Sequence, residues 1–74
     1  MGLKPCTAKK LIRSFIKNGC IIIDGGKGSH TKIKHIKTGA TTTIPKGDLT
    51  NVRHAILNWA ENLGITKDNI EQYL

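Results

Sequence analysis

The chain is poor in aromatic, acidic and cysteine residues. Its 74 residues include one each of Phe, Trp and Tyr, five Asp or Glu, and two Cys. Few aromatics disfavour a sheet that stacks nucleobases, because such sheets carry aromatic side chains in their strands. Two cysteines are too few for a disulfide scaffold or a four-ligand zinc site. We therefore interpret Cys6 and Cys20 as reduced core or boundary residues.

Long apolar runs are also missing. No segment approaches the roughly 20 apolar residues that a membrane-spanning helix needs, and residues 1–10 lack the apolar centre of a signal peptide. The chain has room for one core only. We predict a single domain over residues 1–74, located in the cytoplasm and without membrane association.

Positive charge is what the sequence has in excess. Twelve Lys and Arg against five Asp and Glu give a net charge of +7. The excess is uneven: residues 1–18 contain five basic residues and no acidic one, whereas residues 51–74 are slightly acidic. A solvated lysine-rich surface is one reading of this pattern. So basic a small domain favours a polyanionic partner, most often nucleic acid.

Apolar spacing and turn residues predict a helix followed by three short strands. Thr7 is placed to cap the helix, and Asn18-Gly19 supplies its left-handed end. Its apolar positions are Ala8, Leu11, Ile12, Phe15 and Ile16. Its basic side carries Lys9, Lys10, Arg13 and Lys17. The strands are expected over residues 20–24, 29–36 and 40–44, with Pro45 ending the third. Their short connections favour an antiparallel sheet.

Two helices are expected after the strands. Asp48 or Thr50 is placed to cap the first of them, and Gly64 ends it. Its apolar stripe is Val52, Ala55, Ile56, Trp59, Ala60 and Leu63. Thr66 caps a last short helix that carries Ile70, Tyr73 and Leu74. Because three short strands need a cover on one face, the fold class is α+β. We predict a double-stranded-RNA-binding-like fold, with the helices packed on one face of the sheet.

The second strand is the most informative part of the sequence. Side chains alternate along a strand, so one face shows His30, Lys32, Lys34 and Ile36. The other face shows Thr31, Ile33 and His35. Because Ile33 belongs in the core, we expect the face with His30 to be open to solvent. A histidine beside two lysines suits a phosphate, since lysines hold the anion and a neutral imidazole moves a proton near pH 7.

RNA makes this chemistry possible without a metal. Its 2′-hydroxyl is an internal nucleophile beside the phosphorus, so a base and cations can suffice. We predict His30 as the catalytic residue and no metal or other cofactor, with water, a lysine or a second histidine as the acid. The predicted RNA contacts come from the glycine turn, the open strand face and the first helix: Lys27, Gly28, Ser29, Lys32, Lys34, Lys9 and Lys10.

Other site classes fit less well. Residues 25–29 are glycine-rich but lack the GxxxxGK[ST] pattern of a nucleotide-binding loop, and no helix follows them. His35 falls on the opposite parity from His30, and only a β-bulge would bring the two together. We interpret His35 as structural or surface, and His54 as a residue on a helix surface.

The order of these features resembles the HicA family of mRNA interferase toxins. The resemblance rests on Asn18-Gly19, on the segment Gly26-Lys27-Gly28-Ser29-His30 that opens the second strand, and on Thr43-Ile44-Pro45. It implies a double-stranded-RNA-binding-like fold, cleavage of mRNA with His30 as the catalytic histidine, and a HicB-type antitoxin as inhibitor. Many members have a second histidine directly after the first, where this chain has Thr31.

Two other functions remain open from the residues alone. A non-catalytic RNA-binding module would share the basic surface and leave RNA intact. A DNA-binding helix-turn-helix is suggested by the spacing of Ala60, Gly64 and Ile70, but its recognition helix would be net acidic, which a helix beside phosphates should not be. For an inhibitor we expect an acidic or polar surface that covers His30. The first strand, apolar on both faces, offers a further contact unless Ile22 is buried by the glycine turn.

Overall fold

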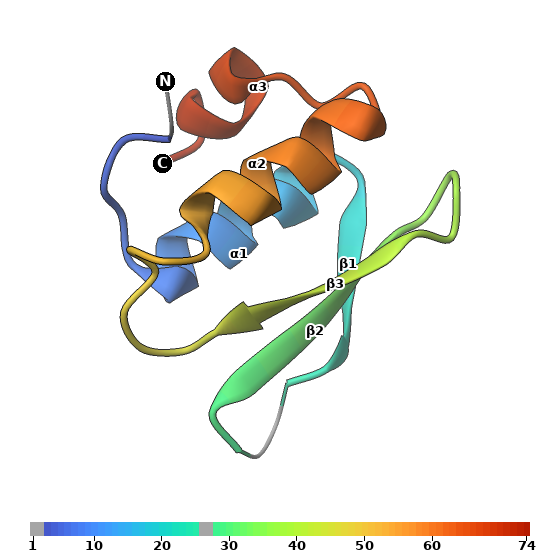
Figure 1. Ribbon diagram of the computed structural model, residues 1–74. Coiled ribbons are helices and arrows are strands. Elements are labelled where there is room, and N and C mark those ends of the chain that lie inside the picture. Colours follow the sequence, from blue (N-terminus) through green and yellow to red (C-terminus); the bar gives the residue numbers. More distant parts are fainter. Residues whose placement is uncertain (1–2, 26–27) are drawn as a thin grey trace.

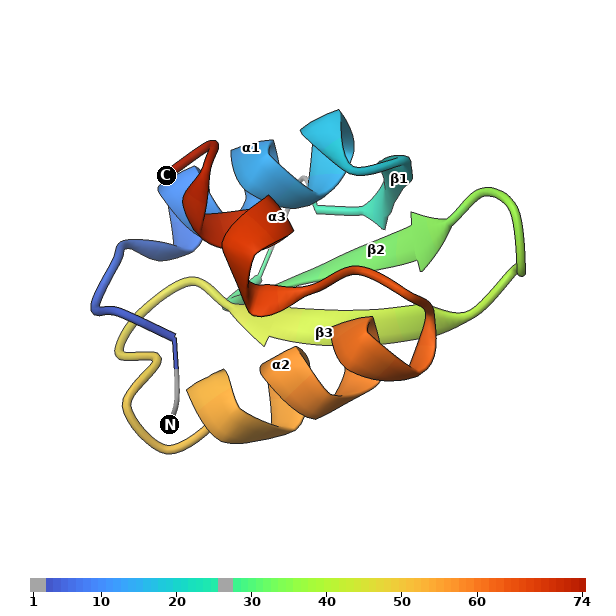
Figure 2. The same ribbon diagram turned by 90° about the horizontal axis from the view of Figure 1, so that it is seen from above.

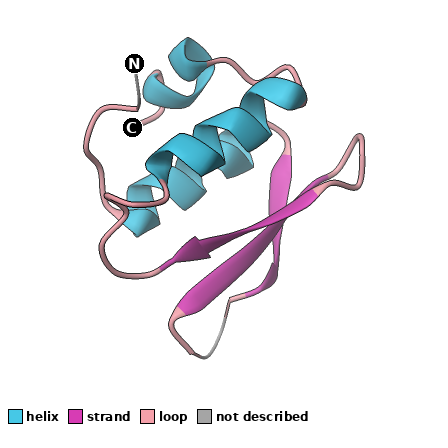
Figure 3. Ribbon diagram, in the orientation of Figure 1, coloured by secondary structure: helices cyan, strands magenta, loops and turns pink. Residues whose placement is uncertain are grey.

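The computed structural model describes residues 3–25 and 28–74. Its elements follow the order α-β-β-β-α-α along the chain (Figures 1 and 3). They are α1 (Ala8–Lys17), β1 (Cys20–Asp24), β2 (His30–His35), β3 (Thr41–Pro45), α2 (Arg53–Asn62) and α3 (Lys67–Glu71). The predicted element order is confirmed, with strand ends displaced by one residue and Pro45 inside β3.

The three strands form one antiparallel sheet in the order β1-β2-β3. Gly28, before β2, and Gly39, before β3, have the positive φ angles of 87° and 79° that favour glycine. A bulge in β1 between Ile22 and Asp24 shifts the register with β2. β2 begins at His30, directly after Gly28 and Ser29, as the sequence indicates.

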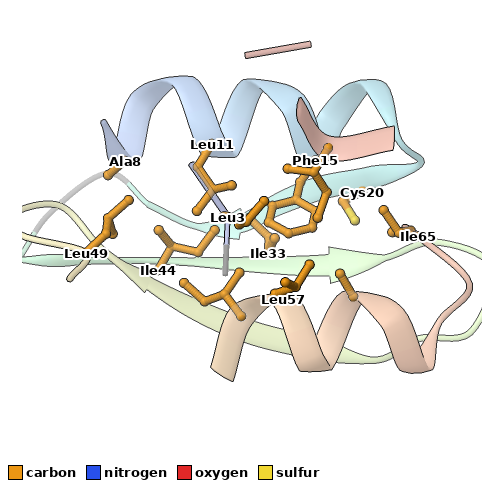
Figure 4. Close-up of a cluster of buried hydrophobic side chains, with 13 residues drawn as sticks. Leu3, Ala8, Leu11, Phe15, Cys20, Ile33, Ile44, Leu49, Leu57 and Ile65 are labelled. Carbon is orange, nitrogen blue, oxygen red and sulfur yellow. The ribbon is translucent and has the colours of Figure 1, made fainter. Parts of the chain in front are cut away.

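All three helices lie on the same side of the sheet (Figures 1 and 2). The α+β class and the double-stranded-RNA-binding-like arrangement are thereby confirmed. The core lies between α1, α2 and the sheet (Figure 4), and its fully buried side chains include Leu11, Phe15, Ile33 and Ile44. The rings of Phe15 and Trp59 meet edge to face, with centroids 5.7 Å apart. Among the residues that the structure describes, none forms a helix over the opposite face of the sheet.

α3 is fastened to α1 by polar contacts that the apolar pattern did not predict. Ser14 is buried in α1 and its hydroxyl donates a 2.6 Å hydrogen bond to the carbonyl of Ile70. Thr66 caps α3 through a complete capping box, as predicted. Ile70 is buried, but Tyr73 is exposed, with its ring 5.9 Å from Lys17 Nζ. A five-residue helix packed in this way serves the core and is too short to act as a recognition helix.

The predicted cap and stripe of α2 need correction. The helix begins at Arg53 after Val52, which makes no side-chain cap, so neither Asp48 nor Thr50 caps it. Ala55 is exposed, and Leu57 is buried in its place. Ile16, assigned to the apolar side of α1, is 46% exposed. These residues stand at the margins of the apolar stripes, where a small rotation of the helix about its axis exchanges inside for outside.

Asp48 instead organises the turn before α2. Its Oδ1 atom accepts hydrogen bonds from the Thr50 hydroxyl at 2.6 Å and from the Thr50 backbone N–H at 2.9 Å. These bonds hold the pKa of the Asp48 carboxyl below its usual value. Because the folded pKa is the lower one, the stabilisation is present above about pH 4 and is lost as pH falls through the folded pKa.

We expect Thr50→Val to raise the pKa of Asp48 toward its usual value, since the first of these two bonds is removed. The measurement is an NMR titration of the Asp48 carboxyl carbon. Thr41→Val, an exposed threonine on β3, is the control and should leave that titration unchanged. An unchanged Asp48 pKa in Thr50→Val would contradict this origin of the shift.

Candidate functional site

The uncovered sheet face, called the open face below, carries His30, Lys32 and Lys34. His30 and Lys32 are exposed and Lys34 is half-buried, whereas Thr31, Ile33 and His35 on the other parity are buried. The alternation predicted for β2 is therefore confirmed. A histidine and two lysines line up on one solvent-facing strand, with alternate residues about 6–7 Å apart along it.

His30 stands at the start of this row, with one ring nitrogen already engaged. Its Nδ1 atom lies 2.9 Å from the hydroxyl oxygen of Ser29. In the sheet register, His30 is opposite Pro45 of β3. The Ser29 contact occupies the Nδ1 side of the imidazole, so Nε2 remains for a ligand on the open face.

Lys46 makes two hydrogen bonds to the segment before His30. The backbone N–H of Lys46 donates to the Ser29 carbonyl at 2.8 Å, and Lys46 Nζ donates to the Gly25 carbonyl at 3.0 Å. A methyl group at Gly25 would come within 2.9 Å of Ile22 Cγ2 and 3.0 Å of Thr31 Cγ2, so a larger residue there would require these side chains to shift. The sequence analysis missed Lys46 as a residue of the site, because its partners lie some 20 residues earlier in the chain.

β1 gives the open face a mixed character. Asp24 is the register partner of Lys32, and Ile21 is the register partner of Lys34. Ile21, Ile22 and Ile23 are 43–48% exposed. On the open face, β1 thus sets Ile21 beside Lys34 and Asp24 beside Lys32, whereas Ile22 pairs with the buried Ile33 and lies on the helix side. Of the two readings left open for Ile22, the structure supports the half-exposed one, although a methyl group of Ile22 lies close to Gly25.

The other histidines do not join His30. His35 is buried on the helix side of the sheet, where its Nδ1 atom lies 2.9 Å from the Thr38 hydroxyl. His54 is exposed on α2. Their interpretation as structural and surface residues agrees with these positions. Within residues 3–25 and 28–74, His30 is the one histidine on the open face.

The predicted RNA contacts fall into two groups. Gly28, Ser29, Lys32 and Lys34 lie at the turn and on the open face with His30. Lys9 and Lys10 lie on α1, on the helix side of the sheet: Lys9 lines a groove together with Gly25, Thr31 and Lys46, and Lys10 lines a different one near the N-terminal segment. Lys27 lies outside the described residues.

The cysteines are free. Cys20 is buried and Cys6 half-buried, and burial raises the pKa of both thiols. In the described part of the chain, no three His, Cys, Asp or Glu side chains come together as a metal site would require. None of the helices described is long and apolar enough to cross a membrane.

A protein-family model described as the HicA toxin of bacterial toxin-antitoxin systems matches residues 8–51. The chain belongs to the HicA toxin family. The matched range contains α1, all three strands and the turn with His30, while α2 and α3 lie beyond it. No curated protein and no solved structure gave a match. As a HicA toxin, the chain is the toxin of a toxin–antitoxin pair and has an antitoxin as partner.

Proposed function

We propose that this HicA chain is a metal-independent endoribonuclease that cleaves mRNA with His30 as its proton-transfer group. The observation that carries the proposal is the row of His30, Lys32 and Lys34 on the open face of a HicA toxin. The row places a base and two cations along one path, which is what cleavage by the 2′-hydroxyl of RNA requires.

The chemistry follows from the geometry of His30. Nε2 takes the proton from a 2′-hydroxyl, the 2′-oxygen forms a bond to the adjacent phosphorus, and the bond from phosphorus to the 5′-oxygen breaks. The products are a 2′,3′-cyclic phosphate and a 5′-hydroxyl. For Nε2 to act as base, Nδ1 carries the hydrogen and donates it to Ser29 Oγ.

The positive charges and N–H groups of the site stabilise the negatively charged phosphate. Lys32 is the next residue on the face after His30, and its ammonium group stabilises the developing negative charge. Gly28 and Ser29 bring backbone N–H groups to the turn, where the absence of a side chain at Gly28 leaves room for an RNA strand. Lys34 extends the basic path to the next part of the RNA.

The departing 5′-oxygen needs a proton. Because His35 and His54 lie away from the open face, this proton comes from water or from a lysine ammonium group. After cleavage, His30 returns its proton to solvent and the site is restored.

The inhibitor in this proposal is a HicB-type antitoxin that covers the His30 face. A ribonuclease without its inhibitor would cut mRNA in the cytoplasm, so its site must be kept covered. The net charge of +7 attracts an acidic partner surface and speeds its encounter with the toxin.

The test is cleavage of a long single-stranded mRNA by the purified chain in EDTA. We expect fragments ending in 2′,3′-cyclic phosphate, and a 2′-O-methyl copy of the same RNA should remain whole because it lacks the nucleophile. Binding without cleavage would instead support a non-catalytic RNA-binding module. Cleavage of the 2′-O-methyl copy would contradict the mechanism.

Ser29 is a positioning residue in this scheme. We expect Ser29→Ala to lower kcat about 2- to 12-fold, the value of one neutral hydrogen bond, with little change in KM. Ser29→Thr retains the hydroxyl and should restore most of kcat. Equal losses in both variants would show that the hydroxyl does not orient the imidazole of His30.

A further inference from the structure

The two edges of the sheet differ in how well they are protected. β1 has three exposed isoleucines in succession, Ile21 to Ile23, and no proline or lysine. β3 carries exposed threonines and includes Pro45, a residue that prevents further pairing. Protein sheets normally protect an edge by such devices, so an apolar unprotected edge indicates a partner.

The backbone of β1 has groups free for such a partner. The Ile36 N–H donates to the Gly19 carbonyl, so Gly19 and Ile36 form a hydrogen-bonded pair at the end of the β1–β2 ladder. In an antiparallel ladder bonded and non-bonded pairs alternate. Counting along the register from Gly19, Ile21 faces β2, and the N–H and C=O groups of Cys20 and Ile22 are directed to the open edge. The edge thus offers a short template for an added strand.

A groove runs beside this edge on the helix side. It has a volume of about 360 Å³, and it is lined by Ala8, Lys9, Ile12, Ile22, Gly25, Thr31 and Lys46. Its walls are mostly apolar, with Lys9 of α1 and Lys46 as the charged members. A side chain from a strand added next to Ile22 on the helix side would point into this β1 groove, because neighbouring strands share their side-chain faces.

The charges decide among the possible occupants. A second copy of the chain would bring another net charge of +7 against the basic surface of the first. RNA would gain nothing from three isoleucines, and its phosphates would be repelled by backbone carbonyls. An extended protein segment with apolar and acidic side chains satisfies all the features: backbone pairing with Ile22, apolar contacts in the groove and an acid near Lys9 or Lys46.

We propose that the antitoxin binds this toxin by adding a strand to the β1 edge, with an apolar side chain in the β1 groove and acidic residues toward Lys9 and Lys46. The inference rests on the antitoxin partner in the proposed function and specifies how that partner is held. A segment added to the outer edge of β1 lies one strand away from β2, which carries His30. An antitoxin anchored there has its body within reach of the open face.

The direct measurement is amide hydrogen exchange of the toxin, alone and with the antitoxin encoded beside it. We expect the Ile22 amide to exchange rapidly in the free protein and at least about 10-fold more slowly in the complex, because it becomes a ladder donor. The Thr43 amide on β3 is the control and should not change. An Ile22 amide that stays unprotected in a saturated complex would overturn the proposal.

Variants test the same point through affinity. Ile22→Pro removes the outward N–H and blocks strand addition, and we expect antitoxin affinity to fall at least about 30-fold, the equivalent of two or more hydrogen bonds. Thr43→Pro makes the matched change on β3, where Pro45 shows that the edge accepts proline, and should retain affinity. Circular dichroism checks that both variants fold. If Ile22→Pro does not fold, the hydrogen-exchange measurement on the native protein decides the proposal.

The outcomes separate this proposal from the ribonuclease proposal. Protection of Ile22 by antitoxin in a chain that cleaves no RNA would support strand addition and refute the catalytic role. Cleavage of RNA and its inhibition by the antitoxin, without protection of the Ile22 amide, would support the ribonuclease proposal and refute strand addition. Protection of Ile22 in the free chain with dimer formation, or on adding 2′-O-methyl RNA alone, would assign the edge to another occupant and overturn the proposal.

Discussion

Replacing His30 with glutamine is expected to lower the RNA cleavage rate about 10²- to 10⁴-fold, the contribution of one general acid–base group. The fold should be unaffected, because His30 is exposed and its side chain contacts Ser29 outside the core. Glutamine keeps a polar side chain of similar reach but cannot accept and release a proton near pH 7. RNA affinity should therefore change much less than the cleavage rate.

The comparison needs a second histidine as control. His54→Gln makes the same chemical change on the exposed surface of α2 and should leave cleavage within about 2-fold of the native rate. Both proteins are assayed on one RNA in EDTA, with unfolding followed in urea. Undiminished cleavage by His30→Gln at native stability would remove this histidine from the mechanism.

Replacing Phe15 with alanine is expected to cost about 3–5 kcal/mol in the free energy of unfolding. Phe15 is fully buried between α1 and the sheet, and its ring meets that of Trp59 edge to face at 5.7 Å. A domain of this size has a total stability of roughly 4–11 kcal/mol. The variant should thus be partly or largely unfolded at 37 °C and should lose toxicity without any change in the site.

Ile16→Ala provides the matched control for this prediction. Ile16 is the next residue on α1, but it is 46% exposed, so its truncation should cost about 1 kcal/mol or less. Urea unfolding of both variants, followed by circular dichroism, gives the two values. Similar losses at positions 15 and 16 would contradict the placement of the core on one side of α1.

The central features of the site could be predicted because strand alternation is a local rule. Once Ile33 is assigned to the core, the parity of His30, Lys32 and Lys34 follows without knowledge of the rest of the fold. The turns and helix ends at the four glycines with positive φ, and the cap at Thr7, are local signals of the same kind. The family adds the order of elements and the expectation that the histidine after Gly28-Ser29 is functional.

The features that were missed depend on contacts between distant residues. Lys46 joins the site through Ser29 and Gly25, and Ser14 is buried because it bonds to Ile70. Neither contact has a spacing that a periodic pattern reveals. The bulge in β1 likewise has no sequence signature, yet it sets Asp24 opposite Lys32 and so places an acid beside the basic row.

The placement of Lys9 and Lys10 shows the limit of charge counting. Both residues add to the positive charge of the first 18 residues, but they lie on α1, on the helix side of the sheet, whereas His30 is on the open face. Net charge describes attraction to a partner at long range, whereas the site is defined by which face each residue occupies. In our proposals, a protein partner on the β1 edge would use Lys9, and RNA on the open face would use β2.

The central claim is that RNA is bound and cut on the open face, and an NMR titration with 2′-O-methyl RNA tests it most directly. This RNA binds but lacks the nucleophile, so the complex persists during the measurement. We predict the largest shifts at His30, Lys32 and Lys34, with His54 and Asn58 on α2 unchanged. Shifts confined to the helices, with His30 unaffected at saturation, would contradict the account.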